Sequence, residues 1–246
     1  MTPAHRATAI APPPAMIAPA ALVLLFDIAA DAAAEHDDWH THEHMPERLG
    51  IPGFRRGTRW VARDAADAVA HYCVVYEVAS LAVLDSAAYR ARLDRPTPWT
   101  SAMMRHYRGM RRALCTLQAS SGCGTGSSLA AITFAPAAAG DDRVERWLSD
   151  DILPRLPKRP GLAGARLFRN ALAATMTTEQ SIRGRDATVH SALLVTGYDH
   201  DAVAALVRGE LAPEQFAARG AAAPEIAVRV CRQAYTLVAG EIAAPP

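Results

Sequence analysis

Three histidines spaced four residues apart are the side chains of this sequence best suited to chemistry. His36, His40 and His44 lie in the segment EHDDWHTHEHMPERLGIPGF. Four-residue spacing places them on one face of an α-helix. Imidazole titrates near neutral pH, so His40 or His44 could move a proton to or from a carbon next to a carbonyl group. We predict catalytic roles for these two rings and for Glu43, which, like Glu47, could fix the tautomer of a ring.

An internal repeat indicates which face of this helix is buried. Adding 108 to a residue number links several pairs of identical residues, namely Phe26 and Phe134, Trp39 and Trp147, Pro46 and Pro154, Pro52 and Pro160, and Gly53 and Gly161. The same offset carries the histidine positions to Val144, Leu148 and Ile152, an apolar row that we expect to face a sheet. By analogy the histidines point inward, and because buried polar groups need partners, we predict a polar pocket there. The alternative is a rotated or frayed helix with the histidines at its solvated edge.

Other polar and aromatic side chains could complete this pocket. Arg59, or Arg48 if it turns inward, could hold a developing enolate or carboxylate. Aromatic side chains could form walls for a planar ligand. The residues that we predict to contact a ligand are His36, Glu47, Arg59, Trp60, His71, Tyr72 and Tyr76. Structural roles are the alternative, because Arg48 can solvate the helix end and the tyrosines can fill a core.

Metal binding by the histidines is a weaker interpretation. Residues 40–44 match the H-x-x-E-H pattern of zinc proteases. However, Pro46 distorts the helix close to the ligands, and one ion could bind only two neighbouring histidines of the row. A third ligand would have to come from His71 or His106. We predict no metal and no cofactor, with a divalent metal or a haem held by the histidines as the alternatives.

The elements that position these residues form a repeated strand, helix, strand, strand, helix, strand pattern. In the first copy the expected strands span 21–28, 54–62, 71–79 and 111–119, and the expected helices span 31–48 and 85–93. In the second copy, a strand at 128–134 and a helix at 141–156 correspond. We predict an α+β fold of two tandem ferredoxin-like (βαββαβ) units whose antiparallel sheets pack face to face as an α+β barrel.

The repeat also predicts the domain organisation. We expect a flexible arm at 1–19, a first unit at 20–117, a Gly/Ser-rich linker at 118–128, a second unit at 129–240 and a tail at 241–246. Past residue 170 the offset grows from 108 to 119, so the second unit holds about eleven extra residues near 171–185. This insertion is polar and lacks periodicity. We expect a loop that covers one end of the barrel or an exposed excursion.

The first helix carries a resemblance to a known family. Its pattern Trp39-x-x-x-Glu43-His44-x-Pro46-Glu47-Arg48-x-x-x-Pro52-Gly53-Phe54 resembles EthD-like members of the dimeric α+β barrel superfamily. The resemblance implies a barrel with ligand cavities between each sheet and its helices. Relatives in that superfamily include cofactor-free polyketide cyclases, lactone isomerases, quinone-forming monooxygenases and haem proteins. In the second unit Glu43 and His44 become Asp151 and Ile152, so we expect no site there.

Charge and composition exclude several partners. The chain has 26 basic and 25 acidic side chains and a formal net charge of +1, which does not favour nucleic acid or an anionic membrane. The basic cluster around Arg105, Arg108, Arg111 and Arg112 is interpreted as a solvated helix face. No apolar run reaches the length of a membrane span, and the four cysteines form no Cys-x-x-Cys motif, so we expect a soluble, cytoplasmic protein with reduced thiols. A homo-oligomer is compatible with the sequence.

These observations predict a small-molecule pocket protein. The favoured function is a cofactor-independent enzyme that uses histidine-mediated proton transfer, as an isomerase, cyclase, dehydratase or monooxygenase. Its substrate would be an aromatic, polyketide-like or lactone compound. The alternatives are a non-catalytic ligand-binding or stress-response protein and a haem-binding barrel.

Overall fold

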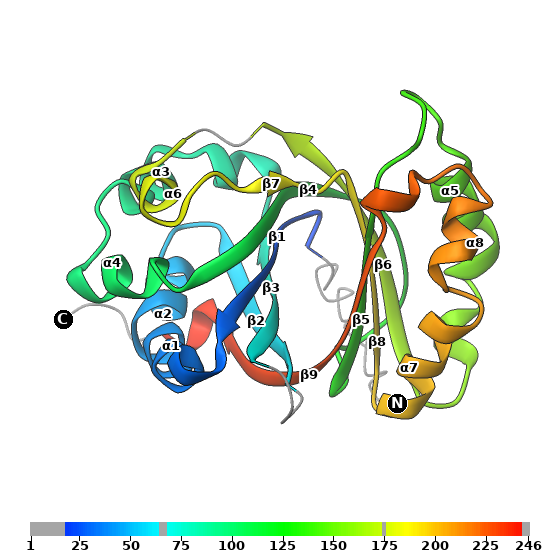
Figure 1. Cartoon of the computed structure of the whole chain (residues 1–246), viewed down its shortest axis with the longest axis horizontal. Helices are drawn as coiled ribbons and strands as arrows, with labels where there is room; N and C mark the ends of the chain where they lie inside the picture. Colours follow the sequence, from blue (N-terminus) through cyan, green and yellow to red (C-terminus); the bar gives the residue numbers. More distant parts are fainter. Residues whose placement is uncertain (1–17, 64–67, 174–175, 243–246) are drawn as a thin grey trace, which may run out of the picture.

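The computed structural model describes residues 18–63, 68–173 and 176–242, and these form an antiparallel barrel covered by helices (Figure 1). Around the barrel the strand order is β1-β3-β2-β9-β5-β8-β6-β4, and pairing of β4 with β1 closes the ring. The short strand β7 adds to β4 in parallel. The α+β barrel class predicted from the repeat is confirmed.

Each half of the chain contributes four strands to the closed ring, and the second half also contributes the short strand β7. The first half contributes β1 (Ala20–Ala29), β2 (Phe54–Ala62), β3 (Val69–Val78) and β4 (Tyr107–Gly122). The second half contributes β5 (Ser128–Phe134), β6 (Leu162–Leu172), β7 (Ala187–Thr188), β8 (Ser191–Gly197) and β9 (Ala227–Val238). Within each half the order is fourth, first, third, second, as expected for a βαββαβ unit.

The halves meet edge to edge through β2–β9 and β4–β6, so the two sheets are opposite walls of one barrel. On the first half lie α1 (Ala33–Trp39), α2 (Met45–Leu49), α3 (Ala87–Leu93), α4 (Pro98–Met104) and α6 (Thr178–Arg183). On the second half lie α5 (Arg143–Arg146), α7 (His200–Arg208) and α8 (Pro213–Ala217). Figure 1 shows these two groups on opposite sides of the barrel.

Both faces of the strands are buried, which explains their continuous apolar sequences. On β1, Ala21, Val23 and Leu25 point into the barrel, whereas Leu22 and Phe26 point outward to the helices. A second outer core lies between the other half of the sheet and its helices. The structure therefore has three apolar layers, one inside the barrel and one under each helix group.

The predicted helix at 31–48 is a composite of short helices joined by a π turn. A 3₁₀ turn at Ala30–Ala32 leads into α1, the π turn spans His40–His44, and α2 follows. The Met45 N–H donates to the His40 carbonyl five residues earlier, directly before Pro46. In the second half Leu153 bonds to Leu148 in the same way, directly before Pro154. The repeat thus extends to the backbone distortion, which accommodates a proline without a donor.

Two segments differ from the sequence expectation. Residues 118–122, predicted as part of a linker, continue β4 and pair with β6, with Gly122 opposite Gly164. Arg111 and Arg112 lie on β4, in agreement with the expected strand at 111–119, and Arg112 is buried, so the interpretation of these arginines as a solvated helix face is wrong. Backbone pairing depends little on a Gly/Ser-rich composition, so composition alone placed the linker too early. Further along, the insertion at 171–185 contains α6 and lies against the first half (Figure 1).

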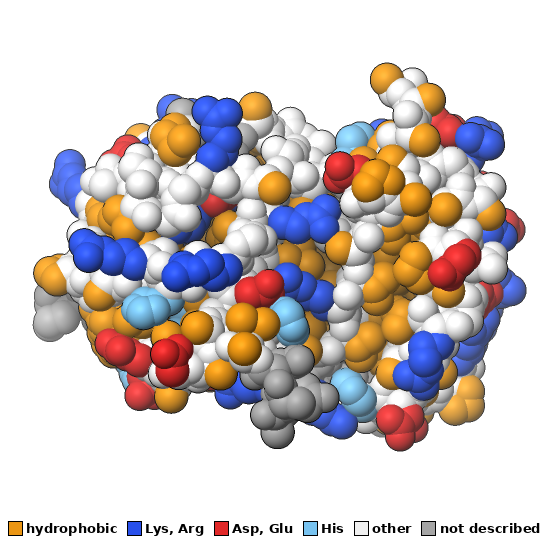
Figure 2. Space-filling model, in the orientation of Figure 1, with side chains coloured by type: hydrophobic (Ala, Val, Ile, Leu, Met, Phe, Trp, Pro, Cys, Tyr) orange, Lys and Arg blue, Asp and Glu red, His pale blue; other side chains and the backbone are white. Residues whose placement is uncertain are grey.

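The surface carries no extended field of one sign in the view of Figure 2, where basic and acidic side chains are interspersed. This distribution agrees with the formal net charge of +1. None of the helices in the described ranges is both long and apolar enough to cross a bilayer.

The turn after the first helix provides a stability prediction. Gly53 has φ +95°, and a Cβ there would lie 2.5 Å from Val83 Cγ2. Gly53→Ala should lower the free energy of unfolding by about 2 to 5 kcal/mol, because left-handed strain and overpacking add. Gly140→Ala is the matched control, since Gly140 has φ +80° but no described atom within 4 Å of the new Cβ. It should lose only about 1 to 2 kcal/mol in urea unfolding. Equal losses in the two variants would contradict the proposed clash.

Candidate active site

The three spaced histidines lie on the inner face of the first helix. The exposed fractions of His36, His40 and His44 are 0%, 2% and 6%, and their neighbouring ring centroids are 5.6 and 5.5 Å apart. The predicted inward orientation is confirmed, and the alternative of a solvated edge is wrong. In the second half the equivalent row, Val144, Leu148 and Ile152, is also buried and packs in an apolar core. The polar row therefore belongs to the first half alone.

Tyrosine hydroxyl groups from the strands face two of these rings. His36 Nε2 lies 3.2 Å from the Tyr107 hydroxyl, and its Nδ1 lies 3.4 Å from Asp37 Oδ1. His40 Nε2 lies 3.2 Å from the Tyr76 hydroxyl. By contrast, the Nδ1 atoms of His40 and His44 are buried and have no hydrogen-bond partner within the described part of the chain. These two nitrogens are available to a ligand.

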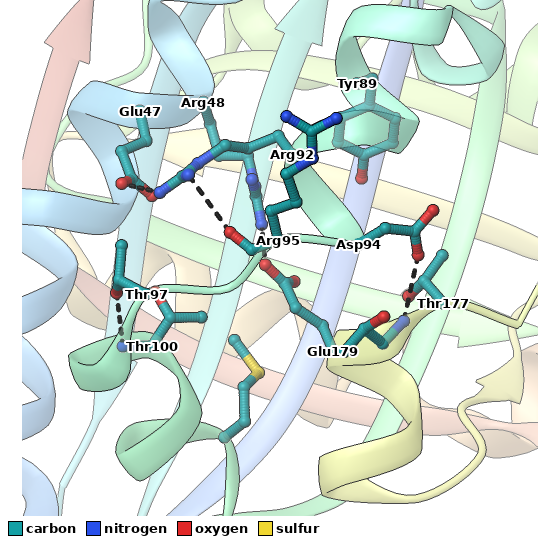
Figure 3. A network of polar contacts seen from close by, with 12 residues as sticks. Glu47, Arg48, Tyr89, Arg92, Asp94, Arg95, Thr97, Thr100, Thr177 and Glu179 are labelled. Atoms are coloured by element: carbon teal, nitrogen blue, oxygen red, sulfur yellow. Dashed lines mark hydrogen bonds and ion pairs between the residues drawn. The ribbon is translucent and has the colours of Figure 1, made fainter.

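Arg48 turns inward one helical turn after His44. Its Nη2 donates to the carboxylate of Glu179 on α6, and both side chains are almost fully buried. Figure 3 shows the two side chains pointing toward each other from α2 and α6. The Arg48 guanidinium carbon also lies 5.9 Å from the centre of the Tyr89 ring. Its Nη1 is buried without a partner among the described residues, so one face of this cation remains available.

A cavity of about 30 Å³ connects these groups. It lies between the first helix, the sheet and α6, and its lining consists of Leu22, Leu24, Phe26, His40, His44, Arg48, Tyr76, Tyr89, Leu93, Met104, Tyr107, Met110, Arg112, Glu179 and Arg183. This volume accommodates about one water molecule. A larger ligand therefore requires outward movement of lining side chains or of α6.

Burial determines the protonation states in this cavity. Burial lowers the pKa of His36, and it lowers the pKa of His40 and His44 well below the usual value of 6.5. The charge of Arg48 lowers the pKa of His44 further. Burial opposes the charge of Arg48 itself, but the nearby Glu179 carboxylate holds its pKa above the ordinary value. At neutral pH the cavity thus presents uncharged imidazoles beside a permanent cation.

Glu43 and Glu47 do not orient the histidine rings as predicted. Glu43 Oε1 accepts hydrogen bonds from Trp39 Nε1 and Thr100 Oγ1, each at 3.1 Å, and from Thr97 Oγ1. It braces the first helix against α4. Glu47 forms an ion pair with Arg92, nearer the surface. Trp39 and Glu43 are four residues apart, so their side chains lie on the same side of the helix and can form the Nε1–Oε1 hydrogen bond.

Strand alternation separates the remaining predicted residues. Tyr72 and Tyr76 face the first helix, and the Tyr72 ring lies 4.6 Å from that of His36. Trp60 instead points into the barrel core, so it is not a wall of this cavity. His71 bonds to Asp27 Oδ1 at 2.8 Å on the opposite face of β3 from Tyr72. Trp60 and His71 were both predicted to contact a ligand in this cavity, and neither of them lines it.

Arg59 lies at the far end of the histidine row from Arg48. Its Nη1 donates to the Asp37 carbonyl at 3.0 Å, and its guanidinium carbon lies 5.6 Å from the centre of the Tyr235 ring. Arg48, considered only as an alternative, lines the cavity together with His40 and His44, whereas Arg59 does not.

Several cavity residues were missed by sequence reasoning. Tyr107 and Arg112 belong to β4, which was interpreted in part as a helix face, and Glu179 and Arg183 belong to the insertion. The residues after Tyr107, Arg-Gly-Met-Arg-Arg, do not alternate between apolar and polar, so they gave no strand signal. No signal could have placed Glu179, because the insertion has no counterpart in the first half.

The side chains do not fit a haem or a metal ion as they lie. A macrocycle is far larger than the cavity, and Arg48 and Glu179 occupy the adjoining space. Within the described ranges no group of three or more His, Cys, Asp or Glu side chains is arranged to hold a metal. His71, considered as a third ligand, lies on the other face of β3. We derive no chemical step from either cofactor.

Comparison with known proteins identifies the fold only. No family model and no curated protein matches the sequence. Among solved structures, an anthrone oxidase-like protein matches with a TM-score of 0.57 and 13% identity over 92% of this chain and 96% of its own. A Fusobacterium nucleatum protein provisionally named a monooxygenase matches with a TM-score of 0.51 and 12% identity, covering 89% and 92%. A Lactobacillus acidophilus protein with the same provisional name has a TM-score of 0.51 and 9% identity, covering 90% and 97%. The chain shares its antiparallel α+β barrel with these proteins.

The buried histidines predict a loss of stability in mild acid. The unfolded chain protonates them below its pKa of 6.5, whereas the folded chain keeps them neutral because burial lowers their pKa. Stability is therefore complete above pH 6.5 and falls below it, by about 1.4 kcal/mol per histidine at one pH unit lower. His44→Ile, which copies Ile152 of the second half, should reduce the difference between urea unfolding at pH 7.5 and pH 5.5 by about 1.4 kcal/mol.

His42→Gln is the matched control for this measurement, because His42 is exposed on the other side of the helix. It should leave the pH difference unchanged. A wild-type stability that is the same at both pH values would contradict burial of neutral imidazoles.

Proposed function

We propose that this chain is a cofactor-independent enzyme that removes a proton from a carbon next to the carbonyl group of an aromatic, polyketide-like compound. The observation that supports it is that three residues around one cavity each carry a buried polar atom without a partner in the described part of the chain. These atoms are Nδ1 of His40, Nδ1 of His44 and Nη1 of Arg48. Buried polar atoms are rarely left without a partner, so such a group is typical of a site that a ligand completes.

The chemistry follows from the charge of each group. A general base must be unprotonated before it acts, and burial keeps His40 and His44 neutral. Loss of a proton from carbon places negative charge on the carbonyl oxygen. Arg48 can hold that oxygen by a charge-assisted hydrogen bond from Nη1. The Tyr76 hydroxyl, 3.2 Å from His40 Nε2, can fix that ring so that Nδ1 faces the ligand.

The lining favours a planar, apolar ligand. Phe26, Tyr76 and Tyr107 supply aromatic surface, and Met104 and Met110 are flexible enough to move aside. The resemblance to EthD-like proteins and the shared fold with an anthrone oxidase-like protein support an enolisable aromatic ketone as substrate. If the resulting carbanion reacts with dioxygen, the net change of a ring methylene is CH₂ + O₂ → C=O + H₂O. This outcome would make the enzyme a monooxygenase, whereas return of the proton would make it an isomerase.

A non-catalytic binding protein is the second candidate, and the closed cavity favours it. The cavity of about 30 Å³ is too small for an aromatic ring unless its lining moves. In addition, Glu43 bonds to Trp39 and Thr100 and so does not increase the basicity of a histidine ring. A binding protein would retain the ligand without exchanging its protons. The two functions therefore separate in an exchange experiment.

Anthrone provides the probe for this experiment. Under anaerobic conditions in deuterated buffer, the wild-type protein should speed loss of the methylene proton signal in NMR spectra. His40→Leu and His44→Ile copy the second half of the chain and should not both retain this activity. Removal of the true base should slow exchange roughly a hundredfold or more. Admission of air then tests whether anthraquinone forms with uptake of dioxygen.

His42→Gln, on the exposed side of the helix, is the matched control and should exchange protons at the wild-type rate. Two results would refute the enzyme. One is a wild-type rate no faster than buffer, and the other is full activity in both the His40 and the His44 variant.

A further inference from the structure

Four ionised side chains line the cavity on the side of Arg48, and a fifth, Asp186, forms ion pairs with two of them. They are three arginines and two carboxylates, and the exposed fraction of each side chain is 5% or less. Arg48 comes from α2, Arg112 from β4, and Glu179, Arg183 and Asp186 from the insertion. The cluster thus joins both halves of the chain at one buried place.

The ion pairs within this cluster use both carboxylates fully. Glu179 accepts from Arg48, and its other oxygen lies 3.8 Å from Arg183. Asp186 accepts two hydrogen bonds from Arg183, at 2.9 and 2.8 Å, and lies 3.8 Å from Arg112. Three positive and two negative side chains leave one positive charge in excess. Arginine does not lose its proton in proteins, so this charge cannot be removed by titration.

The neighbouring groups do not neutralise this excess. The Tyr89 hydroxyl accepts from Arg112 Nη2 at 3.2 Å but carries no charge of its own at neutral pH. Glu47 is paired with Arg92, and Asp37 is paired with Arg59 and Arg63 at the other end of the histidine row. An uncompensated buried charge is strongly unfavourable. Arg48 lines the cavity with His40 and His44, and each of these side chains carries a buried nitrogen without a partner among the described residues.

We infer that the cavity binds its ligand as an oxyanion, with the negative oxygen on Arg48 and the attached ring against the aromatic lining. The bound form is then the phenolate or enolate of an acidic aromatic compound, which is the same anion that forms when the neutral ketone loses its carbon proton. This inference rests on the proposed function for the location of the site and adds the charge of the substrate. It agrees with the role of Arg48 above, because the same oxygen would carry the charge of the enolate.

4-Nitrophenol tests the charge of the bound form directly, because its phenolate absorbs visible light and its phenol does not. We would measure binding at a pH one unit below the pKa of the free compound, with 4-nitroanisole as the uncharged analogue. The wild-type protein should bind the compound as phenolate and prefer it to the anisole roughly tenfold or more, as expected for a hydrogen bond to a charged group. Binding should also lower the apparent pKa of 4-nitrophenol.

Two variants change the excess charge in opposite directions. Arg48→Gln removes it and should lose the phenolate preference. Glu179→Gln keeps a hydrogen bond to Arg48 but raises the excess to two, so it should bind phenolate more tightly than the wild type. A stronger interaction cannot result from partial unfolding, which protects the test against a destabilised Arg48 variant. Arg146→Gln changes the charge by one on the exposed surface of the second half and should have no effect.

The inference is overturned if 4-nitrophenol binds as the neutral phenol, if the anisole binds equally well, or if no binding is detected at millimolar concentration. It is also overturned if Glu179→Gln does not tighten binding. The outcome is independent of turnover. Phenolate binding without proton exchange on anthrone would support the anionic ligand and refute the enzyme. Proton exchange without a preference for phenolate would support the enzyme and refute the anionic ligand.

Discussion

The buried ion pair between Arg48 and Glu179 is the constraint on which the candidate site depends. Its partners come from the first helix of one half and from an insertion in the other, and neither side chain has appreciable contact with water. A buried charge that loses its partner is strongly destabilising, so docking of α6 and the inward turn of Arg48 must occur together. The same pair lines the cavity together with His40 and His44. Access to the histidines and the integrity of the ion pair are therefore coupled, and a ligand that reaches Arg48 must compete with Glu179 or share the guanidinium with it.

The duplicated architecture isolates what the polar row contributes. Both halves share the strand order, the π turn, the proline after it and the Pro-Gly turn that ends the helix. In the second half the inward row is Val144, Leu148 and Ile152, and these residues pack in a continuous core. The fold is thus satisfied by apolar side chains at these positions. Imidazoles that burial holds neutral add no comparable stability, and two of them leave polar atoms unpartnered. Stability does not explain the histidines, whereas a ligand that uses those atoms does.

The sequence was sufficient to predict the barrel class and the inward histidines, because the repeat supplied an apolar row at the same helical positions. Prediction from the sequence failed where two orientations of a side chain give the same pattern of apolar residues. Trp60 and Tyr72 lie on neighbouring strands that are buried on both faces, so an apolar sequence does not distinguish the barrel interior from the helix side. Glu43 has the right spacing for a partner of the histidines, but Trp39 and two threonines bind it instead. Glu179 could not be placed at all, since a contact between an insertion of the second half and a helix of the first half leaves no local signature in the sequence.

The electrostatics of the cavity also restrict how a proton could be moved there. Transfer from carbon to His44 would create an imidazolium close to Arg48, whose charge already lowers the pKa of that ring. The protonated ring is then tolerable only while the enolate oxygen remains on Arg48, because that anion offsets the second positive charge. In such a site His44 would hold the proton only for a short time, before the proton returns to the ligand or leaves with the product. The surrounding burial strengthens both the repulsion and the compensating attraction, so we expect separated charges only while the ligand is bound. The histidine row beside a single excess positive charge is therefore suited to a ligand that is, or becomes, an anion.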